Sequence, residues 1–532
     1  MSTTLVSPLN AERIQAAETR LASPSLQKWA FIMLLTVAAI AIHGYHPYSE
    51  DAGIYVPAIK KLLNPELYPH SAQFFLAPAR LSIFSNVVAA SIRMTHLPLS
   101  CALLLWHAVT LALLFAGCWR FSRLCFGATS VAQYGPLLIA AFLTVPIAGS
   151  SLMLSDPYLT SRSLSTPALV FAICLLLEEK LFGAFLVFLC AFLVHPLMAA
   201  YGGVFLLSLW AVRKRWWWLL PLLAGCILSG ALLALEIAKP FPPSGSYRTA
   251  VLTRTYFFLS QWAWYETLGI IAPLCLFTWV MWRERDYLQG RLGACALAAF
   301  LNGTFFLLLA LTVTRTSAQL VVARYQPMRS FHLLYILMFL LPVNLLMQKT
   351  LDGGRLPLAI FLAVTACAMF AAQRHTFPAS SHLELPGMHS DNPWQSAFEW
   401  SRSNTPRDAL FALDPDYVNA PGEDRRGFRA VAERSALADR SKDGGVVAVF
   451  PDLAEEWTKE VEEAGGVDRA RTGLTTIALR QAGVTWIVTK AGLGATLDCP
   501  YRNHLVAVCH LPGHPQGIVN ENNLAQRNGA AD

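Results

Sequence analysis

Residues 29–55 read WAFIMLLTVAAIAIHGYHPYSEDAGIY, an apolar run followed closely by an acidic pair. The run, from about Trp29 to Ile42, predicts a helix that enters the bilayer, because hydrocarbon cannot satisfy free backbone amides and carbonyls. Glu50 and Asp51 follow within a few residues, so we expect them at the membrane edge. These two carboxylates are the best candidates for chemistry in the chain.

Long apolar blocks recur along the chain. Of its 532 residues, 55% are hydrophobic and 14% are charged, which is typical of a polytopic membrane protein. A membrane β-barrel would instead show short alternating segments. We expect an α-helical membrane protein with about eleven spans, at 29–44, 99–119, 131–148, 163–178, 181–194, 197–212, 216–236, 264–282, 290–313, 331–347 and 356–373.

The block 181–212 decides the topology, because it is either one tilted helix or two short helices that meet at His195-Pro196. Lysine and arginine accumulate in cytoplasmic loops. Only the split places all the short basic loops on the same side, including Arg213-Lys214-Arg215. We therefore expect a multi-pass inner-membrane protein with a cytoplasmic segment 1–28, a transmembrane domain 29–374 and an extracytoplasmic C-terminus.

Two regions outside the spans are expected to be structured. The first external loop, 45–98, is too long for a simple connector. It predicts two helices lying on the membrane surface, at 54–63 with Ser49 as its cap and at 81–92. Residues 375–532 lack apolar blocks and predict a soluble α/β domain. Its expected helices are 394–400, 453–464 and 473–481; its expected strands are 409–413, 485–489 and 505–511, with a further strand within 428–437.

The cysteines do not form a disulfide framework, because nine of eleven lie in or beside spans. Cys499 and Cys509 remain, on the side of the membrane where oxidation is permitted. Sequence spacing leaves a disulfide and two free thiols equally open. No cysteine and histidine spacing indicates a structural zinc site.

Further charged residues fall in the predicted external loops. Asp156 is a second acid there, with an ordinary Asp-Pro turn as the alternative. Arginines in external loops run against the rule that basic residues accumulate on the cytoplasmic side. They indicate either a phosphate-binding role or side chains that reach lipid headgroups. These arginines are Arg254, Arg315, Arg324 and Arg329. His195 could line a cavity at the mouth of the active site, or it could only mark a helix kink. Glu50 and Asp51 could instead only cap a surface helix.

Four short motifs together resemble the GT-C superfamily of membrane glycosyltransferases. They are Glu50-Asp51 followed by Tyr55, the internal turn RFSRLCFG at 120–127, Ser155-Asp156-Pro157-Tyr158 with Arg162, and LRQAGVTWIV at 479–488. The resemblance implies inverting transfer of a sugar from a polyprenyl-phosphate carrier to an extracytoplasmic acceptor. It implies Asp51, or else Glu50, as general base, and it implies that Asp156 helps to position an acceptor or a metal. Partial desolvation at the membrane edge would raise the pKa of the base.

The remaining implications concern ligands and partners. Tyr55 and Arg162 would bind substrate, and the partners would be membrane lipid and a lipid-linked sugar. No cofactor is expected; a divalent metal is possible but not indicated. The net charge of +7 is dispersed at membrane edges, so we expect anionic lipid as its partner and not nucleic acid.

Two other functions stay open. A lipid-linked saccharide transporter or flippase would need paired polar groups deep within its spans, where this sequence has few. A membrane scaffold with a periplasmic binding domain would tolerate the loss of Asp51.

Overall fold

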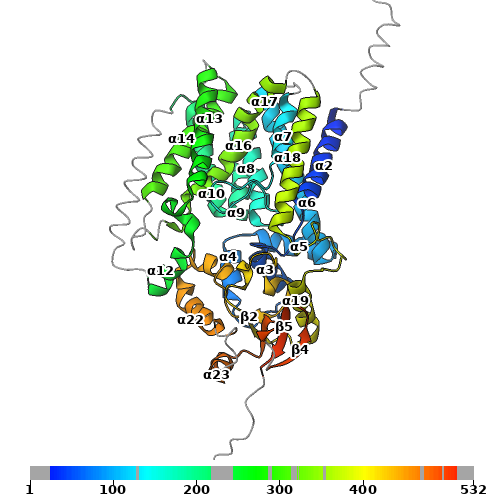
Figure 1. The fold of residues 1–532 in the computed structure, drawn as a ribbon. Helices are drawn as coiled ribbons and strands as arrows, with labels where there is room; N and C mark the ends of the chain where they lie inside the picture. Colours follow the sequence, from blue (N-terminus) through cyan, green and yellow to red (C-terminus); the bar gives the residue numbers. More distant parts are fainter. Residues whose placement is uncertain are drawn as a thin grey trace, which may run out of the picture.

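Apolar helices form a bundle that occupies the upper half of Figure 1. The computed structural model describes residues 24–127, 131–216, 244–284, 290–312, 320, 323–351, 355–465, 467, 473–493 and 497–511. The bundle consists of α2 (Pro24–His43), α6 (Leu99–Phe126), α7 (Val131–Ala141), α8 (Ser161–Leu177), α9 (Leu181–Val194), α10 (Pro196–Arg213), α13 (Trp264–Arg283), α14 (Arg291–Thr312), α16 (Phe331–Met338), α17 (Asn344–Leu351) and α18 (Arg355–Thr376). Phe115, Phe205 and Phe277 are fully buried in its core. Its outer faces are also apolar, as lipid-facing helices require.

Ten of the eleven predicted spans fall on these helices. The eleventh, 216–236, lies outside the described residues beyond its first position. The block 181–212 is split as predicted, because α9 ends at Val194 and α10 begins at Pro196. α16 and α17 form one continuous span through the π-helical segment Phe339–Val343, which contains Pro342.

Fewer of the described segments reach a spanning length than the sequence predicts. Among the described residues, seven helical segments are long and apolar enough to cross a membrane: Leu26–His43, Leu99–Phe126, Pro196–Arg213, Trp264–Arg283, Arg291–Leu311, Pro327–Met347 and Leu356–Thr376. Of the four other predicted spans, 216–236 lies outside the described residues beyond its first position, and the helices α7, α8 and α9 are short. α9 has 14 residues, which at about 1.5 Å per residue is about 21 Å, against a hydrocarbon core about 30 Å thick.

The loop 45–98, the first loop, contains three helices where two were expected: α3 (Ala52–Leu63), α4 (Gln73–Arg80) and α5 (Phe84–Thr95). α4 and α5 meet at an angle of 94°, so the helix predicted at 81–92 begins later, after a bend. The expected Ser49 cap is wrong. Asp51 occupies the N-cap position of α3 without a capping hydrogen bond, and the Ser49 hydroxyl accepts a hydrogen bond from Arg426.

The soluble domain carries helices around a small sheet. Its helices are α19 (Pro393–Asn404), α20 (Phe428–Ala432), α21 (Lys442–Val447), α22 (Ala454–Ala464) and α23 (Gly473–Gln481). Its strands are β1 (Leu410–Ala412), β2 (Ser435–Ala436), β3 (Trp486–Lys490), β4 (Asp498–Arg502) and β5 (Val506–His510). Among the described residues they form one mixed sheet of order β2-β1-β3-β5-β4, in which β1 is parallel to β2 and β3 and the other pairs are antiparallel.

The predicted strands at 409–413, 485–489 and 505–511 are confirmed as β1, β3 and β5. The region 428–437 begins with the helix α20, and only Ser435–Ala436 is a strand. β4 was not expected, because Pro500 and a charged, half-exposed pattern suit only an edge strand. A disulfide joins Cys499 on β4 to Cys509 on β5.

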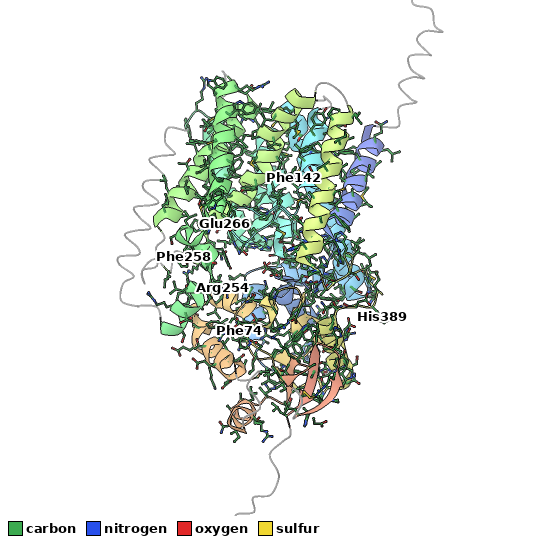
Figure 2. All side chains as sticks on the ribbon, in the orientation of Figure 1. Phe74, Phe142, Arg254, Phe258, Glu266 and His389 are labelled. Atoms are coloured by element: carbon green, nitrogen blue, oxygen red, sulfur yellow. A yellow bond between two sulfur atoms is a disulfide. The ribbon has the colours of Figure 1, made fainter. Side chains whose placement is uncertain are left out.

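The soluble domain packs directly against the first loop, at the lower end of the bundle in Figure 1. The Lys60 ammonium on α3 donates to the Ala430 carbonyl at 2.8 Å and to Glu433 at 2.7 Å. This face of α3 is therefore buried against α20 of the soluble domain, and the expectation that α3 lies on the membrane surface stays a prediction. Figure 2 shows Phe74, Arg254 and Phe258 at the same junction, where both phenylalanines belong to one apolar cluster.

Candidate functional site

Three predicted site residues meet in one ion-pair network. Arg162, in the first turn of α8, donates to Asp51 Oδ2 at 3.1 Å and to Asp156 Oδ2 at 2.8 Å. Asp51 precedes α3, whereas Asp156 lies in the loop before α8. Thr160 and Ser163 form a capping box that fixes the start of α8 and so the direction of the arginine. Segments more than a hundred residues apart thereby bring two carboxylates to one guanidinium.

The two carboxylates differ in exposure. The side chain of Asp51 is 33% exposed, whereas those of Asp156 and Arg162 are 8% and 6% exposed. Burial raises the pKa of Asp156 above its usual value, although Arg162 opposes this. Burial acts on Asp51 in the same direction, but Arg162, Lys442 and Arg329 together hold its pKa below the usual range. The expected rise in the pKa of the base is therefore reversed at Asp51, which is an ionised carboxylate with access to solvent.

Tyr55 stands beside this network on α3. Its hydroxyl oxygen accepts a hydrogen bond from the Ser161 hydroxyl at 2.8 Å, and its ring packs edge-on against Phe84. Tyr55 thus connects the first loop to the start of α8. It also lines a cavity whose wall includes Asp51.

A cavity of about 970 Å³ contains Asp51, Asp156 and Arg162 in its wall. Five cations and three carboxylates line it, a formal excess of two positive charges: Arg162, Arg254, Arg324, Arg329 and Lys442 against Glu50, Asp51 and Asp156. His195 lines it too, and its Nδ1 accepts a hydrogen bond from the Met198 amide at 3.4 Å. Arg315 lies outside the described residues.

The arginines of the loops predicted to be external hold different positions around this cavity. Arg329 stacks on the ring of Tyr256 at 5.3 Å, and Arg324 stacks on Tyr325 at 5.0 Å. The Nε atoms of both arginines are buried and have no hydrogen-bond partner among the described residues. Both side chains also line the cavity, and a guanidinium is well suited to bind an anionic ligand. Arg254 instead donates to the backbone carbonyls of Arg440 and Ser441.

A divalent metal does not fit the acidic residues of this site. The Arg162 guanidinium already lies between Asp51 and Asp156, where a cation would bridge them. Within the described ranges, no group of three or more histidine, cysteine, aspartate or glutamate side chains could hold a metal ion. The positive charge between the two carboxylates is supplied by the Arg162 side chain.

Sequence reasoning missed Lys442, which comes from the soluble domain. Its ammonium donates to Glu50 and lies 3.8 Å from Asp51 Oδ1. The separation of 392 residues between Lys442 and Glu50 leaves no local pattern that could have identified it.

Comparison with known proteins agrees with this architecture. No protein-family model matches the chain, and no curated protein matches it. The oligosaccharyltransferase of Archaeoglobus fulgidus, in a crystal structure tethered by a disulfide to an acceptor peptide with an NVT sequon, is 11% identical, with a TM-score of 0.50. The match covers 88% of this chain and 70% of that chain. The apo form of the same enzyme and its complex with an inhibitory peptide and a dolichol-phosphate show the same identity and coverage, with TM-scores of 0.47.

The TM-score of 0.50 over 88% of this chain shows a shared fold, at an identity of only 11%. The α-helical membrane architecture with a C-terminal soluble domain, predicted from the sequence, is confirmed. The chain therefore shares the fold of the archaeal oligosaccharyltransferase.

Proposed function

We propose that this protein is a membrane glycosyltransferase that moves a sugar from a polyprenyl-phosphate donor to an acceptor outside the cytoplasm, with inversion. The observation that carries the proposal is the central cavity, where an accessible carboxylate lies beside an excess of cations. The carboxylate suits proton abstraction, and the cations suit a phosphate leaving group. We further propose an inner-membrane location with a cytoplasmic N-terminus, since basic residues concentrate in the loops on that side.

Asp51 is the proposed general base. Its carboxylate takes the proton of the acceptor hydroxyl while the acceptor oxygen attacks the anomeric carbon. The bond from that carbon to the phosphate oxygen breaks, and the electron pair leaves with polyprenyl phosphate. Attack opposite the leaving group inverts the anomeric centre. Asp156 is more buried than Asp51, and it accepts a hydrogen bond from Arg162. We therefore assign it the role of a positioning residue for Arg162.

Arg324 and Arg329 are the proposed phosphate ligands. Both side chains lie in the wall of the same cavity as Asp51. Negative charge grows on the phosphate oxygens as the donor bond breaks, and fixed cations in a site with little water stabilise that charge. Arg254 is already committed to backbone carbonyls, so we assign it a structural role at this rim.

An adjoining groove suits the lipid tail. It has a volume of about 380 Å³, is mostly apolar, and lies between the first-loop helices and the junction of α9 with α10. It shares Leu81, Ser82, Phe192 and Pro196 with the cation-lined cavity. Phe192 is also exposed on the outer face of the bundle. A polyprenyl phosphate could therefore keep its tail toward lipid while its phosphate reaches the arginines.

The test is native mass spectrometry of the protein purified in mild detergent. We expect the wild type to retain a polyprenyl-phosphate species and the double variant Arg324→Ala/Arg329→Ala to lose it. The exposed Arg407→Ala on the soluble domain is the matched control and should retain the lipid. Equal retention by the wild type and the double variant, or none in either, would remove the phosphate site and favour a scaffold or a transporter.

A further inference from the structure

The soluble domain contributes a charged side chain to the candidate active site. Lys442, at the start of α21, donates to the Glu50 carboxylate and lies 3.8 Å from Asp51. We propose that Lys442 is a positioning residue for the acidic pair, so that the active site is complete only when the soluble domain is docked. The inference rests on the proposed function, because it assigns a role relative to the proposed base.

The backbone that carries Lys442 is held firmly from its own domain. Asp443, the next residue, accepts two hydrogen bonds from Arg429 at 2.8 and 2.9 Å. The Asp439 carboxylate accepts from the amides of Lys442 and Asp443. These bonds fix the first turn of α21. The fold therefore sets the position of the Lys442 ammonium. The Lys442 side chain is only 15% exposed, so it is not a freely rotating surface charge.

The bundle side of the same interface also fixes this turn. Arg254 donates to the carbonyl of Ser441 at 2.7 Å, one residue before Lys442. α21 packs between α4 of the first loop and α12 (Gly245–Leu252). Val447 belongs to the apolar cluster that includes Phe74 and Tyr247. Contacts from three parts of the chain therefore converge on a helix of six residues.

The turn at Glu50, which Lys442 contacts, has a backbone conformation that contacts from the soluble domain help to stabilise. Glu50 has a φ of +48°, a left-handed conformation that is uncommon for a residue with a side chain. The loop beside it is anchored by the soluble domain on both sides, through Arg426 to Ser49 and through close backbone packing of Gly427 on Gly53. Lys442 completes this frame by bonding the side chain of Glu50 itself.

Two cations then hold Asp51 from opposite oxygens. Arg162 binds Oδ2 and Lys442 lies near Oδ1, while Arg329 acts at longer range. The other titratable groups that interact with Asp51, Arg162 or Lys442 are Glu50, Tyr55, Asp156, Tyr158, His195, His332 and Asp439. Without Lys442, Asp51 would lose one of these cations and the turn at Glu50 would lose its side-chain partner. We expect a more mobile carboxylate that binds a proton more readily.

The first measurement needs no substrate. Carbodiimide couples an amine to protonated carboxyl groups, so the extent of coupling at Asp51, read by peptide mass spectrometry from pH 4 to 7, reports its titration in the full-length protein. We expect increased coupling in Lys442→Gln, and wild-type coupling in Lys442→Arg. Lys459→Gln is the matched control, since Lys459 is 75% exposed on α22 of the same domain. Equal coupling in all variants would overturn the inference.

The second measurement uses farnesyl phosphate, a short soluble analogue of the leaving group, and turnover of a farnesyl-phosphate sugar. Lys442→Gln should bind farnesyl phosphate as the wild type does, but its turnover should fall about tenfold, because small displacements of a reacting group are costly. A parallel loss of farnesyl phosphate binding would make Lys442 a phosphate ligand and overturn the positioning role. Failure of the wild type to bind farnesyl phosphate would count against the proposed function, while the coupling result would still decide the Lys442 contact.

Discussion

Substitution of Asp51 by asparagine separates chemistry from structure at the centre of the network. Asparagine keeps the shape of the side chain but cannot accept a proton from the acceptor hydroxyl. Loss of a general base typically costs about 100- to 10,000-fold in rate, which corresponds to about 3–5 kcal/mol in the activation free energy. We expect a loss of this size in the release of polyprenyl phosphate.

The same substitution should cost little stability. Arg162 keeps its shorter bond to Asp156, at 2.8 Å, so the buried guanidinium stays paired. Asp51 is one-third exposed, and water screens its attraction to Arg162, so we expect a loss of about 1 kcal/mol or less. Asp156→Asn removes the more buried partner, and breaking a buried pair costs up to about 3–5 kcal/mol. Asp156→Asn should therefore lower the melting temperature more than Asp51→Asn does.

Both quantities can be measured on the same preparations. Purified protein is incubated with a lipid extract containing polyprenyl-phosphate sugars, and free polyprenyl phosphate is quantified by mass spectrometry. Melting is followed by intrinsic fluorescence in the same detergent. Asp452→Asn, an exposed carboxylate of the soluble domain, is the control. Activity of Asp51→Asn above one-tenth of the wild type, or a larger loss of melting temperature in Asp51→Asn than in Asp156→Asn, would refute the reasoning.

Three further predictions concern the soluble domain and its interface. Gly427→Ala should lower both the melting temperature and the turnover, since its Cβ would lie 2.8 Å from Gly53 Cα. Gly53→Ala would place its Cβ 3.5 Å from its nearest contact, so its effect in both assays should be smaller. Cys499→Ser should lower the unfolding free energy of the domain by about 2–3 kcal/mol, because the disulfide to Cys509 closes a loop with a sequence separation of 10; denaturant melts with and without reductant should show the same loss. Burial raises the pKa of Glu460 to about 7. Its contribution to stability is therefore complete below the pKa of the unfolded chain and is lost as pH rises through about 7. The melting temperature should fall between pH 5 and 8, and Glu460→Gln should make that fall smaller.

The sequence predicted the bundle well because lipid imposes one strong rule on it. Every backbone group in hydrocarbon must be paired, so long apolar blocks become helices wherever they occur. The same rule does not distinguish a full crossing from a short helix inside the bundle. α8 and α9 are as apolar as their longer neighbours, and only the breaks at Glu178 to Lys180 and at His195-Pro196 shorten them.

The acidic site was predictable in its residues but not in its geometry. Asp51, Asp156 and Arg162 were singled out from short motifs in loops expected on the same side of the membrane. That Arg162 bridges the two acids depends on how α3 and α8 pack, which no local pattern records. Lys442 lies in a soluble domain whose docking follows from tertiary contacts, so the sequence held no signal for it.

The loop 45–98 is held both by the bundle and by the soluble domain. One small apolar cluster of the loop includes Tyr68 and Phe75, and a larger cluster packs α3 and α5 against the start of α6. Conformational entropy opposes holding a loop carboxylate in one place, so each added contact counts. The soluble domain adds polar contacts, through Lys60 to Glu433 and through the Tyr68 hydroxyl to the Arg429 carbonyl. The position of the proposed base is therefore a property of two domains, and variants at this interface should change turnover even when they lie far from the acceptor.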